Sequence, residues 1–185
     1  MELSAIIIAL VGLAVSIVAF IYGKKASDKA SSMETSDRLM RIHEEIKTGR
    51  KVMRDIYDSW LEYSRLNLTP ELLLGSENSK AKYSAINYYN MNYHDQPGNS
   101  KNRMLSDSIH TYFRHLNHLW TRVERKEFKK SEVAEHFRRD ITMDEALLKI
   151  YLEAHWIARG EFKNAEDKTF WSNIPKLIES IKTWE

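Results

Sequence analysis

Apolar side chains dominate the start of the chain after Glu2, without a charged interruption. The twenty residues from Leu3 to Tyr22 carry no charge. A helix rises about 1.5 Å per residue, so such a segment spans about 30 Å, the thickness of the hydrocarbon core of a bilayer. Its end, Phe20-Ile21-Tyr22, is followed by Gly23-Lys24-Lys25, an interfacial aromatic residue and then cations. The pattern predicts a transmembrane anchor at residues 1–23. A cleaved signal peptide is the alternative, but the chain start, Met-Glu-Leu-Ser, lacks a basic n-region.

Lysines flank the predicted anchor on one side only. Lys24, Lys25 and Lys29 follow it, and no Lys or Arg precedes it. Positively charged flanks stay on the cytoplasmic side of a membrane. We therefore expect a single-pass protein of an inner membrane, with its N-terminus outside and its C-terminal domain in the cytoplasm, in contact with the lipid bilayer.

Small residues recur along the anchor at alternating steps of four and three. They are Ala5, Ala9, Gly12, Ser16, Ala19 and Gly23. Membrane helices associate by close packing, which small side chains permit. The spacing predicts a homo-oligomer joined along this face, although Ala and Gly are also frequent in any membrane span.

An amphipathic helix follows at residues 24–66, with a seam of apolar positions in three-four alternation. The seam comprises Leu39, Ile42, Ile46, Gly49, Met53, Ile56, Trp60 and Tyr63. A period near 3.5 fits both a coiled coil between two chains and a helix packed in its own bundle, so both alternatives stay open. Gly49 lies on the seam and should weaken the helix by ~1 kcal/mol relative to alanine.

Residues 67–185 carry helical patterns and no strand pattern. Thr69-Pro70 is a helix start, with a capping residue before proline at the first helical position. A helix from about residue 101 to 125 is predicted by an apolar face of Leu105, Ile109, Tyr112, Phe113, Leu116, Leu119, Trp120 and Val123. Ser131 is expected to cap a helix that ends near Ile141. Thr142 to Glu145 forms a capping box that predicts a new helix ending at Gly160, and a last helix should begin near Pro175. The fold class is therefore all-α, with a cytoplasmic helical bundle.

Tyrosine and asparagine are concentrated between Tyr83 and Tyr93. The run Asn87-Tyr88-Tyr89-Asn90-Met91-Asn92-Tyr93 leads to an evident loop at Gln96-Pro97-Gly98. Aromatic residues anchor protein interfaces when they are exposed. We expect this segment to form an irregular helix and to face an unknown protein partner.

The segment YFRHLNHLWTRVERKEFKKSEVAEHF begins at Tyr112, and in it aromatic and leucine positions precede a charged hinge. With the anchor and the long helix, this layout resembles an uncharacterised family of small single-pass membrane-anchored all-helical proteins of bacteria and their viruses. The resemblance covers residues 107–141 and the anchor. It implies an all-helical fold and no catalytic residues.

Composition excludes several kinds of chemistry. The chain has no cysteine, which rules out disulfides, thiolate zinc sites and cysteine nucleophiles, and its six glycines form no nucleotide-binding fingerprint. His115 and His118, three residues apart, could share a metal ion with His136 or His155. His110 lies on the same predicted helix, but the sequence has neither a His-Glu-x-x-His nor a Glu-x-x-His motif, so we expect surface or boundary histidines, no metal and no cofactor.

Seven cations lie at the end of the predicted helix 101–125 and after it, and they raise the question of nucleic-acid binding. They are Arg122, Arg125, Lys126, Lys129, Lys130, Arg138 and Arg139. Glutamates are interleaved with them, and the net charge of the whole chain is only +2, whereas a phosphate-binding surface should be markedly basic. The sequence thus favours a membrane-anchored binding or regulatory module that is not an enzyme and does not bind nucleic acid. The alternative is a membrane-tethered effector or enzyme with a histidine metal site or a nucleic-acid target.

Overall fold

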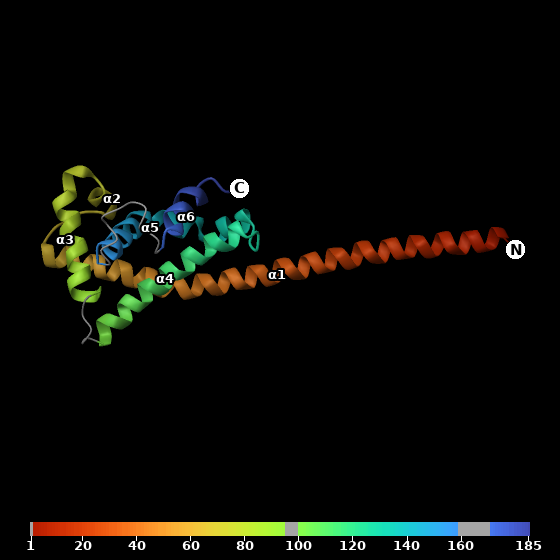
Figure 1. Cartoon of the computed structure of the whole chain (residues 1–185), viewed down its shortest axis with the longest axis horizontal. Helices are drawn as coiled ribbons and strands as arrows, with labels where there is room; N and C mark the ends of the chain where they lie inside the picture. Colours follow the sequence, from red (N-terminus) through yellow and green to blue (C-terminus); the bar gives the residue numbers. More distant parts are fainter. Residues whose placement is uncertain (1, 95–99, 159–170) are drawn as a thin grey trace. The chain divides into compact units, whose positions relative to one another are not determined.

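A computed structural model describes the backbone of residues 2–94, 100–158 and 171–185, and the side chains of residues 16–93, 102–158 and 171–185. Every regular element in these ranges is a helix. In order they are α1 (Glu2–Ser64), α2 (Pro70–Leu73), the 3₁₀ turn η1 (Ser76–Asn78), α3 (Ser79–Tyr89), the π-helical turn η2 (Asn90–His94), α4 (Ser100–Glu124), α5 (Lys130–Ala158) and α6 (Asn173–Ile181) (Figure 1). The predicted all-α class is confirmed.

The chain divides into two compact units, Met1–Leu39 and Met40–Glu185. The first unit consists of the N-terminal part of α1, and its described side chains from Ser16 to Glu34 are exposed. Among the described residues, no helix is both long and apolar enough to cross a membrane. The predicted anchor thus gains no support from the structure. The side chains of its residues 1–15, which include three of the six small residues, lie outside the residues whose side chains are described.

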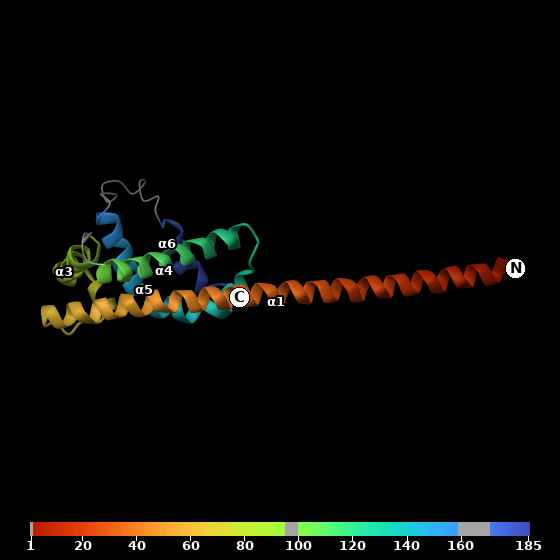
Figure 2. The ribbon, with the colours of Figure 1, turned by 90° about the horizontal axis from the view of Figure 1, so that it is seen from below.

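The second unit is a helical bundle with one apolar core. Helix α6 packs against both α4 and α5, while α2 and α3 contact α5 at the end of the bundle away from the C-terminus (Figures 1 and 2). The predicted face of α4 is almost wholly buried, with Leu105 and Trp120 partly exposed. The partly exposed Trp120 is stacked on the buried Trp184, with ring centroids 6.0 Å apart.

The seam of the long helix packs inside its own chain. Ile46, Met53, Ile56 and Trp60 are buried in the second unit, whereas Tyr63 is exposed. The Tyr151 hydroxyl of α5 donates a hydrogen bond to the Met53 carbonyl at 3.0 Å. The period of the seam left open a coiled coil or a bundle, and this part of the seam packs in the bundle of its own chain.

One predicted helix boundary is wrong. Helix α5 continues through Thr142 to Glu145, where the capping box predicted a new start. Apolar positions keep their helical spacing across this point, because Phe137, Ile141 and Leu148 are all buried along α5. Packing of this continuous face overrides the local capping signal, since most helical stability in a protein comes from its buried face.

Helix α4 ends without the glycine that a helix end commonly uses. Lys126 takes a left-handed conformation, with φ 60°. The Lys126 amide donates to the Val123 carbonyl and the Glu127 amide donates to the Arg122 carbonyl, each at 2.9 Å. This pair of bonds is a Schellman motif, which satisfies carbonyls at the helix end. The chain can therefore turn from α4 into α5 within a few residues.

Candidate functional site

A buried network of charges joins α1, α4 and α5. Asp144 of α5 has no exposed side-chain surface and forms salt bridges with Arg50 and Arg54 of α1. The Tyr112 hydroxyl of α4 donates to the Asp144 carboxylate at 3.4 Å. Arg50 also pairs with Asp140, whose Oδ2 lies 2.7 Å from Nε2 of His43.

The network is electrically balanced and closed. Burial tends to lower the pKa of Arg50, but the hydrogen bond and charge of Asp144 outweigh it, so the pKa is raised and the guanidinium stays charged. Burial, together with the Asp144 charge, raises the pKa of Tyr112 well above its usual value. Two arginines face two aspartates, and each carboxylate already accepts bonds from this chain. This arrangement joins α5 to α1.

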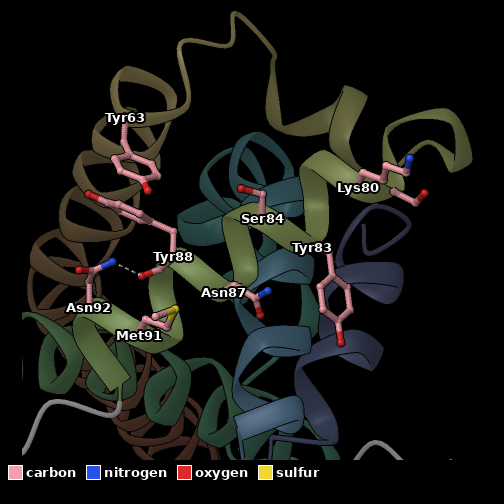
Figure 3. Close-up of a pocket in the computed structure, with 9 residues that line it drawn as sticks. Tyr63, Lys80, Tyr83, Ser84, Asn87, Tyr88, Met91 and Asn92 are labelled. Carbon is pink, nitrogen blue, oxygen red and sulfur yellow. Dashed lines mark hydrogen bonds between the residues drawn. The ribbon is translucent and has the colours of Figure 1, made fainter.

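An open groove of about 1050 Å³ lies on the outer face of α3 (Figure 3). Its lining consists of Tyr63, Ser79, Lys80, Tyr83, Ser84, Asn87, Tyr88, Met91 and Asn92. Tyr63 comes from the end of α1, and the others come from α3 and η2. We call this surface the tyrosine groove.

The opposite face of α3 is held firmly by the bundle. Tyr89 packs edge-on against Tyr151 with ring centroids 4.8 Å apart, and burial raises its pKa to about 12. Asn90 donates a hydrogen bond to the Ala154 carbonyl at 3.2 Å, and Lys82 pairs with Glu153 at 3.0 Å. The tyrosine groove therefore rests on a helix whose position is set by contacts with α5.

Side chains within the tyrosine groove are also positioned by their neighbours. The Trp60 indole donates a hydrogen bond to the Ser84 hydroxyl at 3.3 Å. Tyr63 lies against Tyr88, with ring centroids 5.3 Å apart, and the Asn92 amide donates to the Tyr88 carbonyl at 2.8 Å (Figure 3). Tyr63, Met91 and Tyr83 are the most exposed large side chains of the groove, with exposed fractions of 74%, 67% and 55%. The groove thus combines side chains that are hydrogen-bonded to their neighbours with three large exposed side chains.

The groove is poor in charge. Residues 78–94 contain Lys80 and Lys82 and no carboxylate, whereas 29% of the whole chain is charged. Lys82 is paired with Glu153, and in the described part of the chain Lys80 forms no salt bridge. The cores of protein interfaces are likewise depleted of charge and enriched in tyrosine and methionine.

The histidines considered from the sequence do not gather into one site, and His155 is buried and not at the surface or boundary as expected. His115 Nε2 lies 3.0 Å from a Glu45 carboxylate oxygen, while His118 is exposed. Burial lowers the pKa of His115 against the opposing effect of Glu45, which favours the neutral ring near pH 7. His155 packs edge-on against His110, with ring centroids 5.2 Å apart, and His136 lies against Phe137. No group of three or more histidine or carboxylate side chains that could hold a metal occurs in the described ranges.

Several of the cations between α4 and α5 already have contacts in the fold. Arg122 lies over the Phe128 ring at 5.3 Å, and Lys130 lies 6.0 Å from the Trp184 ring. Arg138 donates to the Ile181 carbonyl at 3.1 Å, and Lys129 pairs with Glu132 at 3.2 Å. Four of the seven cations named from the sequence therefore have contacts within the fold.

Sequence reasoning identified part of the tyrosine groove and missed the rest. It singled out the segment from Tyr83 to Tyr93, but Tyr89 is buried, and Tyr63 and Lys80 belong to the groove. The helical spacing of Lys80, Ser84, Asn87 and Met91 carried a signal, because it places all four on one face of a helix. The position of Tyr63, in contrast, depends on packing between distant parts of the chain.

The chain was compared with family models, curated proteins and solved structures. No family model, no curated protein and no solved structure matches the chain.

Proposed function

We propose that the protein is a helical binding or regulatory module, tethered to a membrane by its N-terminal helix and self-associating there. The observation that carries the proposal is the tyrosine groove, an exposed, charge-poor surface on a helix that is held by contacts with α5. Tyr and Trp supply large contact areas at a small cost in conformational entropy, while Ser and Asn supply adaptable hydrogen bonds. These residue types dominate the groove.

The membrane tether is proposed from the sequence and from the exposed part of α1. Leu3 to Tyr22 is free of charge and is followed by Lys24 and Lys25. Within the described residues, Ile17, Phe20 and Tyr22 are between 51% and 71% exposed. Large exposed apolar surfaces on a soluble protein are uncommon and mark a contact with a membrane or a partner. A bilayer fits because these exposed apolar residues belong to an uncharged segment of bilayer length.

The tether is tested by extraction of native membranes with alkaline carbonate. The full chain should stay in the membrane pellet, and a variant lacking residues 1–23 should move to the supernatant. In the proposed orientation, a reporter fused after Glu185 should be active only if it functions in the cytoplasm. Release of the full chain by carbonate would contradict a membrane-spanning anchor.

The groove is tested by photo-crosslinking of the full chain in its native membrane. A benzophenone amino acid replaces Tyr83, which is exposed in the groove, or Glu135, which is exposed on α5 and serves as the control. We expect defined protein adducts at position 83 that are absent at position 135. If position 83 yields no more adduct than position 135, the groove is not a binding surface.

A further inference from the structure

The exposed residues of α3 form a continuous helical face that continues into η2. Lys80, Ser84, Asn87 and Met91 recur at steps of four, three and four residues, Tyr83 lies beside Ser84, and all five are exposed. Between Lys80 and Met91 a helix rises about 17 Å, or roughly three turns. Such a face has the length and spacing needed to receive a second helix along it.

The shape of this face favours a helix as its occupant. Ser84 and Asn87 are short side chains at the centre, whereas Tyr83 and Tyr88 are large and both line the same groove (Figure 3). Helices pack when the ridge of one enters the groove of the other. The turn η2, where Met91 lies, is π-helical, and single π-helical turns occur frequently at functional sites.

We propose that the occupant of the tyrosine groove is the α3 face of a second copy of this chain, packed antiparallel about a two-fold axis near Asn87. The proposal rests on the proposed function, because it names the partner of that groove. A two-fold contact joins the same surface of both copies, so the face must complement itself. In the antiparallel register, Asn87 meets Asn87 of the second copy, and Tyr83 meets Met91.

The chemistry of the face supports this pairing. Two asparagine amides can exchange hydrogen bonds, since each carries a donor group and an acceptor oxygen. A methionine sulfur against a tyrosine ring is a favourable contact. Both pairs use side chains that are exposed in the single chain.

The position of Lys80 selects the antiparallel direction. It is the only charged residue that lines the described groove. In the antiparallel register, the two Lys80 positions are separated by about 20 Å along the helix axis, where repulsion is largely screened. A parallel pair would place the two cations side by side. A partner helix bearing a carboxylate near Lys80 would also fit the charge, and the experiment below distinguishes it.

The size of the face indicates a weak contact that a membrane can strengthen. Three turns of helix bury less than the roughly 800 Å² per partner of a standard stable interface. Tethering two copies to one bilayer raises their effective concentration and favours such a contact. The dimer is therefore expected in the membrane, and its dissociation is expected when detergent dilutes the chains.

Disulfide cross-linking tests the register, because the natural chain contains no cysteine. Full-length variants Asn87→Cys, Lys80→Cys and Glu135→Cys are oxidised in native membranes. For packed helices 8–10 Å apart, the Cα atoms of facing residues lie within the distance that a disulfide bridges. We expect a covalent dimer with Asn87→Cys only. Co-expression of Tyr83→Cys with Met91→Cys should give the mixed dimer in excess of either self-dimer.

Each other outcome overturns the pairing. Dimers with both Asn87→Cys and Lys80→Cys would mean a parallel pair, and equal dimers with Glu135→Cys would mean random collision. No dimer, combined with a benzophenone adduct at position 83 whose mass differs from twice that of the chain, would assign the groove to another protein and leave the proposed function standing. The absence of both the dimer and the adduct would contradict the pairing and the proposed function of the groove.

Discussion

Replacement of Asp144 with alanine is expected to destabilise the bundle by ~3–5 kcal/mol, because it removes one partner of a buried ion pair and leaves charge without compensation. Asp144 is fully buried, and the side chain of Arg50 is only 14% exposed. The half-exposed Arg54 can turn to solvent, but Arg50 retains only Asp140. Urea unfolding of the full-length protein, followed by circular dichroism, measures the loss.

Glu145 is the matched control for this experiment. It is the next residue of α5, and its carboxylate pairs with Lys149 at 2.7 Å and Lys182 at 2.9 Å near the surface. Exposed ion pairs contribute about 0–1 kcal/mol, so Glu145→Ala should change stability little. A cost below ~1 kcal/mol for Asp144→Ala would mean that the network does not hold α5 to α1.

The stretch from Thr142 to Glu145 illustrates why local sequence signals predicted a wrong helix boundary. Thr142 and Glu145 have the spacing of a helix start, yet Asp144 between them is the carboxylate that binds α1. Its partner Arg50 is 94 positions away in the chain. Nothing in the local spacing identifies that partner, because the contact exists only after the two helices pack. The helical character of both segments, in contrast, follows from periodic apolar positions such as Ile46, Met53 and Ile141.

The candidate site was predictable to the extent that it is local. An excess of tyrosine and asparagine marked residues 83–93 as a candidate interaction surface. Which tyrosines face solvent could not be deduced, because Tyr83 and Tyr89 differ only in the side of α3 on which they lie. The seam of α1 was ambiguous for a similar reason: a helix packed within its chain and one packed between chains have the same period.

Gly49→Ala is expected to give the second large effect, and its effect on protein stability is opposite in sign to that expected from helix propensity. Alanine favours a helix over glycine by ~1 kcal/mol, so the sequence alone predicts that Gly49→Ala stabilises the protein. In the fold, a Cβ atom on residue 49 would lie 2.5 Å from the Ser108 carbonyl oxygen and 2.6 Å from Cβ of Tyr112. The carbonyl oxygen is a backbone atom and the Cβ atom is bonded directly to the backbone, so neither can move away by side-chain rotation. Helices α1 and α4 would have to separate.

Gly49→Ala should therefore destabilise the protein by ~1–3 kcal/mol, the usual cost of overpacking a core. Separation of the two helices would also strain the bond between Tyr112 and Asp144, which are joined at 3.4 Å. Gly23→Ala is the control within the same helix, since a Cβ there meets no atom within 4 Å. Thermal unfolding should show a lower midpoint for Gly49→Ala and an unchanged or higher one for Gly23→Ala. A higher midpoint for both variants would mean that propensity prevails and that α1 and α4 do not pack as closely as Gly49 permits.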